Sequence, residues 1–315
     1  MTIFQSIKQC ISNQKIKKKA DKSSDKLKSG DILIFVAGDA WISKAIALLT
    51  GSNVSHTAIM SSDKQMVEMI AKGITCSNVE KSDSGVDVYQ LRHTAALDYT
   101  PVVSATQKYI HAETVYNFPA LALLAGLIIY RKLRPTSKLI KIVDMILYSA
   151  CIALDNLIQK IMKYPSKAMV CSQLVYQIYE DCAKIDEKYH IKINNGLLQK
   201  HDNSNKSDGY VSFIDLAKDV QETEMTSLET INIPDEDELY KELYEALTDS
   251  EKADDQALET VDFGTLPVTV KRFMDKTNEF LIKAKCEIPL DALFITPADY
   301  LKAENLVQVD KTKIR

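Results

Sequence analysis

The apolar positions in the first third of the chain predict an antiparallel sheet with one early helix. Residues 32–36 form an unbroken apolar run between turn residues, which is typical of a buried strand. Residues 40–50 carry apolar side chains at helical spacing and stop at Gly51, so we expect a helix with a glycine C-terminal cap. Further elements are expected in chain order, as strands at 52–60, 65–70, 73–77 and 86–91 and a helix at 104–115.

The strands on either side of residues 61–64 are close enough in the sequence to form a hairpin. If residue 60 pairs with residue 64, His56 lies directly opposite Glu68, and both side chains leave the same face of the sheet. A carboxylate beside a histidine raises the imidazolium population and fixes the orientation of the ring. Two interpretations are open here: a base held by a carboxylate, or a surface ion pair that contributes little.

Two long apolar runs follow this predicted sheet. Residues 120–130 are almost continuously apolar, and residues 137–162 read as a long apolar-rich helix. The first run is too short to span a bilayer, and Asp144 and Asp155 interrupt the second. We therefore expect a helical hairpin over 119–162. Three roles are open for this hairpin: packing on the core, shaping an acyl-chain pocket, or lying at a membrane interface. Core packing is the simplest of the three.

A shorter helix is expected after Pro165, because proline cannot continue a preceding helix. Leu174, Val175 and Ile178 give this helix one apolar face, which places Cys171 in its first turn. Unpaired backbone N–H groups and the helix dipole favour a thiolate there. Cys171 is then either a candidate nucleophile or a small unreactive core residue.

The last part of the chain is expected to contain an acidic helix and two terminal strands. Residues 235–262 are rich in Asp and Glu, with leucines at helical spacing, so this helix has either a solvated face or a protein partner. A helix is also expected at 268–285. Strands are expected at 190–193, 292–300 and 306–309.

Composition and charge narrow the function classes. The 315 residues carry a formal net charge of −4, which gives no general reason to expect a nucleic-acid partner. The six cysteines show no CxxC pair and no Cys/His spacing typical of zinc, so we expect reduced thiols and no metal or other cofactor.

The N-terminal residues 1–27 are basic and carry a few apolar side chains at helical spacing. They are expected to be a partly disordered tail, with peripheral binding to an anionic membrane as the alternative. No apolar signal core is evident in this segment, so we expect a cytoplasmic, or membrane-associated, location. Specialised secretion systems read other signals, and export by one of them stays open.

Six motifs follow one another in the order "SGDILIF", "ISKAIALLTGSNVSHTAIM", "MVEMIA", "VYNFPA", "MVCSQLVYQIY" and "FITPADYL". Together they resemble the YiiX-like permuted papain-fold hydrolases of the NlpC superfamily, which also includes the lecithin:retinol acyltransferase group. The resemblance covers residues 28–118, 163–182 and 295–309. Its strongest parts are the "TGS…SH" turn into a strand and the "CS-x-LVY" helix.

This resemblance implies a role for four residues. Cys171 would be the nucleophile, His56 the base and Glu68 the residue that orients the base. Tyr116, in "VYNF", matches a tyrosine that approaches the site in this family. Cysteine, histidine and a carboxylate are the minimum set for thiol-based acyl transfer. In papain-type enzymes the cysteine comes before the histidine along the chain, whereas here His56 and Glu68 come before Cys171, as in a circularly permuted chain.

We therefore expect an α+β fold in which a circularly permuted papain-like antiparallel sheet packs on the nucleophile helix. Residues 28–118, 163–220 and 286–310 would form this domain. The hydrophobic hairpin at 119–162 and an acidic helical segment at 221–285 are insertions that the family usually lacks.

The expected function is a cysteine-dependent hydrolase or acyltransferase that acts through an acyl-thioester. The resemblance implies a peptide-amide or lipid-ester substrate, and the apolar hairpin favours an acylated or lipid one. The alternative is a catalytically inactive papain-like platform that binds a membrane or protein partner.

Overall fold

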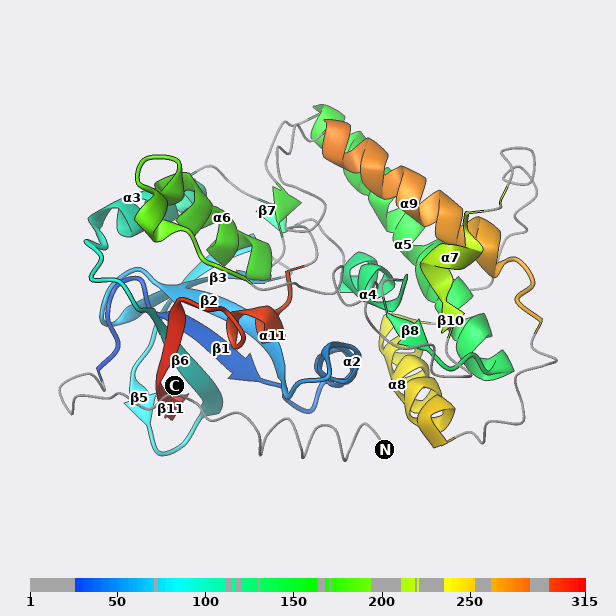
Figure 1. Ribbon diagram of the computed structural model, residues 1–315, viewed down its shortest axis with the longest axis horizontal. Helices are drawn as coiled ribbons and strands as arrows, with labels where there is room; N and C mark the ends of the chain where they lie inside the picture. The colour runs from blue at the N-terminus through cyan, green and yellow to red at the C-terminus, as the bar shows by residue number, and fades with distance from the viewer. Residues whose placement is uncertain are drawn as a thin grey trace.

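The computed structural model describes residues 26–70, 73–111, 115–116, 120–129, 131–163, 168–169, 171–193, 211–218, 220, 235–252, 262–283 and 295–315. The fold is of mixed α+β class, with an antiparallel sheet and its covering helices on one side and a group of long helices on the other (Figure 1). We call these two parts the sheet lobe and the helical lobe. Most of the predicted basic tail lies outside the described residues.

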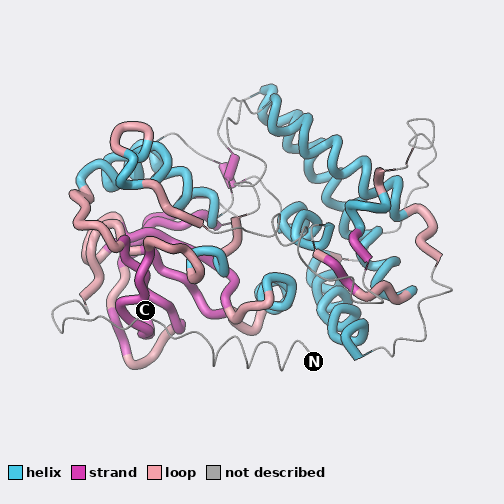
Figure 2. The backbone as a smooth tube through the Cα atoms, viewed as in Figure 1, coloured by secondary structure: helices cyan, strands magenta, loops and turns pink. Residues whose placement is uncertain are grey.

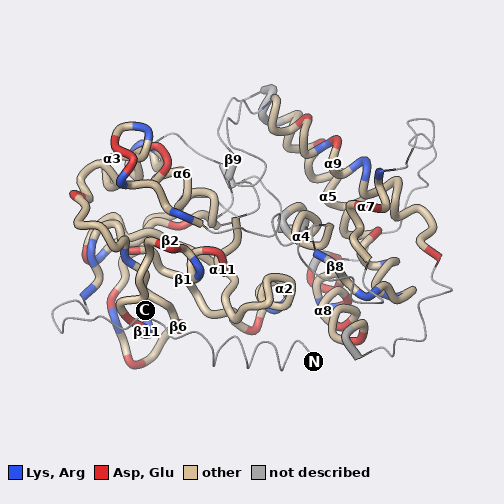
Figure 3. The backbone as a smooth tube through the Cα atoms, viewed as in Figure 1, with Lys and Arg blue, Asp and Glu red and all other residues tan. Residues whose placement is uncertain are grey.

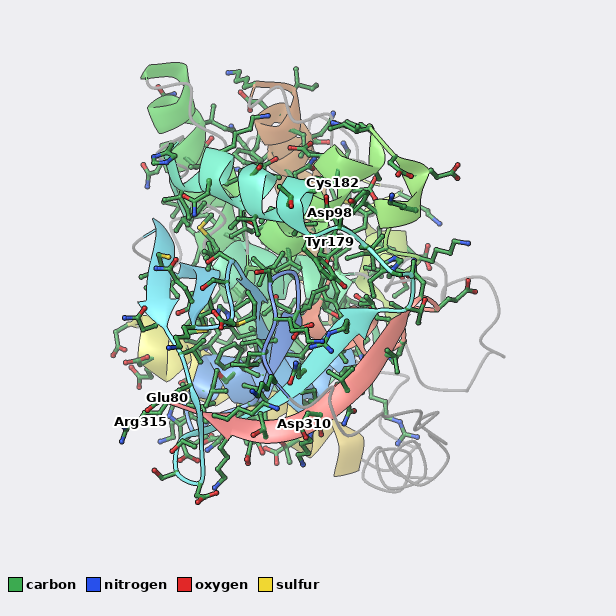
Figure 4. The ribbon with its side chains drawn as sticks, turned by 90° about the vertical axis from the view of Figure 1, so that its left-hand side faces the viewer. Glu80, Asp98, Tyr179, Cys182, Asp310 and Arg315 are labelled. Atoms are coloured by element: carbon green, nitrogen blue, oxygen red, sulfur yellow. The ribbon has the colours of Figure 1, made fainter. Side chains whose placement is uncertain are left out.

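The sheet has seven strands in the order β4-β3-β2-β1-β6-β11-β5, and every neighbouring pair is antiparallel. The strands are β1 Ile32–Val36, β2 Val54–Met60, β3 Gln65–Ile70, β4 Gly73–Asn78, β5 Lys81–Ser82, β6 Val86–His93 and β11 Leu306–Ile314. The C-terminal strand β11 lies between β6 and β5, so the end of the chain completes the sheet that β1 begins. Near this edge Asp310 pairs with Lys81 at 2.5 Å. Arg315 pairs with Glu80 at 3.2 Å, and Figure 4 labels both residues at this end of the sheet.

The sheet lobe has a different apolar core on each face of its sheet. Ile34 packs with Leu174 and Ile178 in one core, while its neighbour Leu33 packs with Val88 in a smaller core. This alternation follows from the two-residue period of a strand. The helices on the first face are α3 Thr100–His111, α6 Cys171–Ala183, the 3-10 helix η1 Glu187–Tyr189 and the short α11 Pro297–Tyr300. Figure 2 shows α3 and α6 together above the sheet.

The helical lobe has one shared apolar core. Its helices are α2 Trp41–Thr50, α4 Ala120–Ile129, α5 Ser137–Lys163, α7 Phe213–Leu216, α8 Glu236–Lys252 and α9 Leu266–Lys283. Two short ladders complete the described elements, β7 Val115–Tyr116 with β9 Ala168–Met169, and β8 Lys132–Leu133 with β10 Val211–Ser212. Helix α2 ends at Gly51, whose φ of 61° is left-handed as the predicted cap requires.

The two predicted insertions pack against each other in this lobe. Asp155 of α5 pairs with Lys276 of α9 at 2.6 Å, and Asp144 accepts a hydrogen bond from Thr265 at 2.6 Å. Both contacts have the same offset along the two helices, so α5 and α9 run parallel. The acidic helix α8 buries its leucines in the shared core and leaves acidic side chains exposed. Figure 3 marks the acidic positions along this helix in red.

The apolar side chains described in α4 and α5 are mostly buried in this core. Core packing, the simplest of the three roles expected for the hairpin, is therefore confirmed for these side chains. In the part of the chain that the structure describes, none of the helices combines the length and apolar character needed to cross a membrane.

Two predicted strands are wrong. Residues 190–193 follow η1 without joining a sheet, because the Asn305 side chain and the Glu304 N–H take the hydrogen bonds of Lys192. In the predicted strand at 292–300, residues 297–300 form helix α11 after a capping box.

One predicted helix is displaced. Helix α3 begins at Thr100 rather than 104, because Asp98 accepts hydrogen bonds from the Thr100 N–H at 2.9 Å and from its hydroxyl at 2.7 Å. Residues 112–114, in the last part of the prediction, lie outside the described chain.

Candidate active site

Cys171 is the first residue of α6, as the apolar spacing predicts. It is only 8% exposed and packs in the same core as Ile34, Val54 and Ile59 of the sheet. A residue at this position is next to backbone N–H groups that no helical carbonyl can satisfy. The first turn of α6 can therefore stabilise negative charge on the sulfur, or on an oxygen that forms beside it.

The short helix α11 holds this first turn in place. The Tyr300 hydroxyl donates to the backbone oxygen of Ser172 at 2.5 Å, and the Ser172 hydroxyl donates to the backbone oxygen of Ile295. Asp299 accepts hydrogen bonds from both the N–H and the hydroxyl of Thr296, each at 2.8 Å. These buried bonds fix the residue that follows Cys171 from two sides.

His56 and Glu68 are in direct contact. His56 Nε2 lies 2.7 Å from Glu68 Oε2, and the two side chains are 25% and 15% exposed. The ring of Phe35 packs edge-on against the imidazole, with ring centroids 5.2 Å apart. A hydrogen-bonded carboxylate on one side and an aromatic ring on another restrict the orientation of His56.

The register of the β2–β3 hairpin differs from the one assumed above. Residue 60 pairs with Met66 rather than with residue 64, so Ala58 lies directly opposite Glu68 and His56 is its diagonal neighbour. The prediction that His56 lies directly opposite Glu68 is therefore wrong. A shift of two residues leaves every side chain on its original face, which is why the two side chains still meet.

A β-bulge lies beside His56. Phe35 pairs with His56, but the next residue of β1, Val36, pairs with Val54, so Ser55 is an extra residue in β2. Bulges increase the local twist of a strand and change the direction of nearby side chains. This distortion helps to explain how two consecutive residues, His56 and Thr57, both interact with Cys171.

His56 also interacts with the sulfur of Cys171. Burial alone would lower the pKa of His56, but the charge and hydrogen bond of Cys171, and then those of Glu68, raise it to about 10. Burial would likewise raise the pKa of Cys171, but the charge and hydrogen bond of His56, together with Thr57, hold it below its ordinary value. Both shifts favour a thiolate–imidazolium pair. Since Nε2 is bonded to Glu68, the ring nitrogen left for the sulfur is Nδ1.

Tyr116, the fourth residue implied by the resemblance, lies on β7. This strand pairs in parallel with β9, and Tyr116 is opposite Met169, two residues before Cys171. Its backbone therefore runs beside the segment that leads into α6. Its side chain lies outside the described atoms, so its role stays a prediction.

A second histidine–carboxylate pair, which was not expected from the sequence, joins Glu180 near the end of α6 to His190, which follows η1. His190 Nδ1 is 2.5 Å from Glu180 Oε1, and the two side chains are 39% and 26% exposed. Burial raises the pKa of Cys182, in the last turns of this helix, to about 11. The pair therefore resembles the candidate site in its residue types but has no activated cysteine.

Sequence reasoning also missed Thr57 and Tyr300. Thr57 directly follows His56 and gave no signal of its own. Tyr300 lies in "FITPADYL", where the spacing of Thr296, Pro297 and Asp299 is a helix-start pattern that could have placed it after a cap. The described residues contain no group of three or more His, Cys, Asp or Glu side chains that could hold a metal ion.

Comparisons of the chain with protein-family models, curated proteins and solved structures found no match. The resemblance to YiiX-like hydrolases therefore stays a prediction made from the motifs. What the structure adds is independent of it: a cysteine at a helix N-terminus, within reach of a histidine that is bonded to a glutamate.

Proposed function

We propose that the protein is a cysteine-dependent hydrolase or acyltransferase with a circularly permuted papain-like sheet lobe. The observation that carries this proposal is the position of His56, whose Nε2 lies 2.7 Å from Glu68 and whose charge and hydrogen bond lower the pKa of Cys171. In this arrangement Cys171 is the nucleophile, His56 moves the proton and Glu68 orients the ring.

The first half of the reaction forms an acyl-thioester. The Cys171 thiolate attacks the carbonyl carbon of an amide or ester, and the π electrons move to the carbonyl oxygen. Backbone N–H groups in the first turn of α6 are placed to stabilise that oxygen. The His56 imidazolium then gives its proton to the leaving nitrogen or oxygen as the bond to the acyl carbon breaks.

The second half releases the acyl group. Neutral His56 takes a proton from water, or from an alcohol or amine acceptor, as that molecule attacks the thioester carbon. The C–S bond breaks, its electron pair returns to sulfur, and the thiolate–imidazolium pair forms again. Water gives hydrolysis, whereas another acceptor gives acyl transfer.

The substrate is proposed at the level of two classes, peptide amides and acyl lipids. The apolar hairpin had favoured lipids. However, its described side chains mostly pack into the core of the helical lobe, so they supply no separate argument for a lipid substrate. The experiment therefore compares substrates from both classes.

The test uses four probes: a short-chain and a long-chain 4-nitrophenyl ester, a peptide 4-nitroanilide, and phosphatidylcholine vesicles. Turnover is followed, and the acylated protein is detected by intact mass after acid quenching. We expect wild type and the matched control Cys151→Ala to form an acyl adduct on Cys171 and to turn over substrate. Cys171→Ala should do neither. Absence of an adduct with every probe, together with equal rates in wild type and Cys171→Ala, would contradict the proposal and favour a catalytically inactive platform.

A further inference from the structure

Thr57 is a buried polar residue beside the sulfur of Cys171 that the proposed chemistry has not used. It follows His56 on β2 and pairs with Ile34, which packs in the same apolar core as Cys171. The whole residue is 0% exposed. Its hydroxyl oxygen is one of the few buried side-chain atoms, among the described residues, that make no hydrogen bond. A buried hydroxyl without such a bond costs stability, so its position calls for a reason.

The backbone N–H of Thr57 is also placed outside the regular ladder. Successive N–H groups of an antiparallel strand point alternately to its two neighbours. Met60 N–H donates to Asp31 O on the β1 side at 2.8 Å, so the N–H of Thr57 points to the β3 side. The pairing between β2 and β3 covers residues 58–60 of β2, and its last pair is Ala58 with Glu68, so it stops one residue short of Thr57. This N–H is therefore available to another acceptor.

We propose that Thr57 is a further polar partner of the nucleophile: once the sulfur is ionised, the hydroxyl and backbone N–H of Thr57 donate to the Cys171 thiolate alongside His56. This inference rests on the proposed function, since it concerns the same sulfur. The direction of the pKa shift agrees with it, because hydrogen bonds from both the side chain and the backbone of Thr57 lower the pKa of Cys171.

The two donors act on one form of the sulfur. A thiolate is a strong hydrogen-bond acceptor, whereas the sulfur of a neutral thiol accepts only weakly. Thr57 therefore favours the ionised free enzyme. It also favours the step in which water attacks the thioester, the C–S bond breaks and the electron pair returns to sulfur, because a stabilised thiolate is the better leaving group.

The experiment compares Thr57→Val with Thr57→Ser and wild type. Valine keeps the shape of the side chain but removes the hydroxyl, and serine keeps the hydroxyl. Thr277→Val is the matched control, since Thr277 is also buried but donates to Phe273 O in α9 of the helical lobe. The second-order rate constant for alkylation of Cys171 by iodoacetamide is measured from pH 4 to pH 10, by mass spectrometry of its peptide.

We expect the profiles of Thr57→Val and wild type to cross. Loss of one hydrogen bond to a charged group raises the pKa by roughly one unit, so the thiolate fraction below the pKa falls about tenfold. Because each remaining thiolate is roughly threefold more nucleophilic, alkylation there becomes about threefold slower. Above the pKa it becomes roughly threefold faster, because thiolate nucleophilicity rises with pKa with a Brønsted slope of about 0.4–0.5. A merely structural role of Thr57 predicts no crossing. Thr57→Ser and Thr277→Val should follow the wild-type profile.

Two results overturn the inference and can be told apart. If wild-type Cys171 is alkylated rapidly near neutral pH and the Thr57→Val profile superimposes on it, Thr57 is not a partner of the thiolate, and the proposed function stands. If wild-type Cys171 reacts like an ordinary thiol, both proposals fail. Should the valine variant not fold, Thr57→Ala against Thr57→Ser makes the same comparison, with the crossing expected for alanine alone.

Discussion

The two lobes each contain a buried cysteine in a helix, and the two thiols have opposite properties. Cys171 begins α6 of the sheet lobe, and its pKa is lowered by His56 and Thr57 against the effect of burial. Cys151 lies in the middle of α5 in the helical lobe, and burial raises its pKa to about 12. Burial alone therefore keeps a cysteine protonated. A helix N-terminus and polar partners are what make a buried thiol reactive.

The surroundings of the two cysteines differ in the same way. Cys151 packs with apolar side chains from α2, α4, α5, α8 and α9, and the charged groups that act on its thiol oppose one another, two of each sign. Around Cys171, buried polar groups from β2, α6 and α11 are interleaved with the apolar residues, including Thr57, Ser172 and Asp299. Buried hydroxyls of the helical lobe, such as those of Ser149 and Thr277, donate to carbonyls of their own helices, whereas those of Ser172 and Tyr300 in the sheet lobe link separate elements at the candidate site.

The largest effect is expected from removing the base. In His56→Ala the thiol of Cys171 loses its charged partner, and burial then raises its pKa, as it does for Cys151. We expect the alkylation rate of Cys171 at pH 7 to fall by about 10² or more. The matched control is His190→Ala. It removes the histidine that pairs with Glu180 of α6, and it should leave the alkylation rate of Cys171 unchanged. Equal rates in all three proteins would show that His56 does not activate the sulfur.

A smaller effect is expected from Glu68→Gln. A carboxylate favours the charged form of an adjacent imidazole, so its loss lowers the pKa of His56 from about 10. The range in which thiolate and imidazolium coexist then ends at a lower pH. Because the ring also loses the carboxylate that orients it, we expect turnover near neutral pH to fall by about tenfold. The basic limb of the pH–rate profile measures this shift. Glu180→Gln is the control. An unchanged basic limb in Glu68→Gln would show that Glu68 takes no part in the mechanism.

The smallest effect is expected from Tyr300→Phe, which removes one hydrogen bond to the first turn of α6. Loss of a buried hydrogen bond costs about 1 kcal/mol of unfolding free energy. Tyr109→Phe should have a similar cost, because Tyr109 donates to Asp181 further along the same helix. Only Tyr300→Phe should also slow turnover, by about threefold to tenfold, since it loosens the turn that carries Cys171. Equal turnover in the two variants would leave Tyr300 with a purely structural role.

Much of the first third of the chain could be predicted from local patterns. The apolar run at 32–36, the helix that stops at Gly51 and the hairpin strands all lie close to where the sequence places them. It was also predictable that His56 and Glu68 leave the same face of the sheet, because side chains along a strand alternate between its two faces. The register was not, because a shift of two residues keeps every apolar side chain on the same face.

Features that depend on distant contacts could not be predicted in this way. Nothing local in the sequence indicates that α5 and α9, more than 100 residues apart, pack in parallel. The segment 190–193 resembles a strand, but the Asn305 side chain satisfies one of its backbone groups. Thr57 shows the same limit at the candidate site, because its position beside Cys171 follows from tertiary packing and from the end of the β2–β3 ladder.

The most direct test of the central claim is the pH dependence of alkylation of Cys171 and Cys151 in one sample of native wild-type protein, resolved by peptide mass. We predict that Cys171 reacts with limiting iodoacetamide well below pH 8 and faster than the same thiol in denatured protein, while Cys151 stays protected until the protein unfolds. If Cys171 reacts no faster than the denatured thiol near neutral pH, the sulfur is not activated and the account is contradicted.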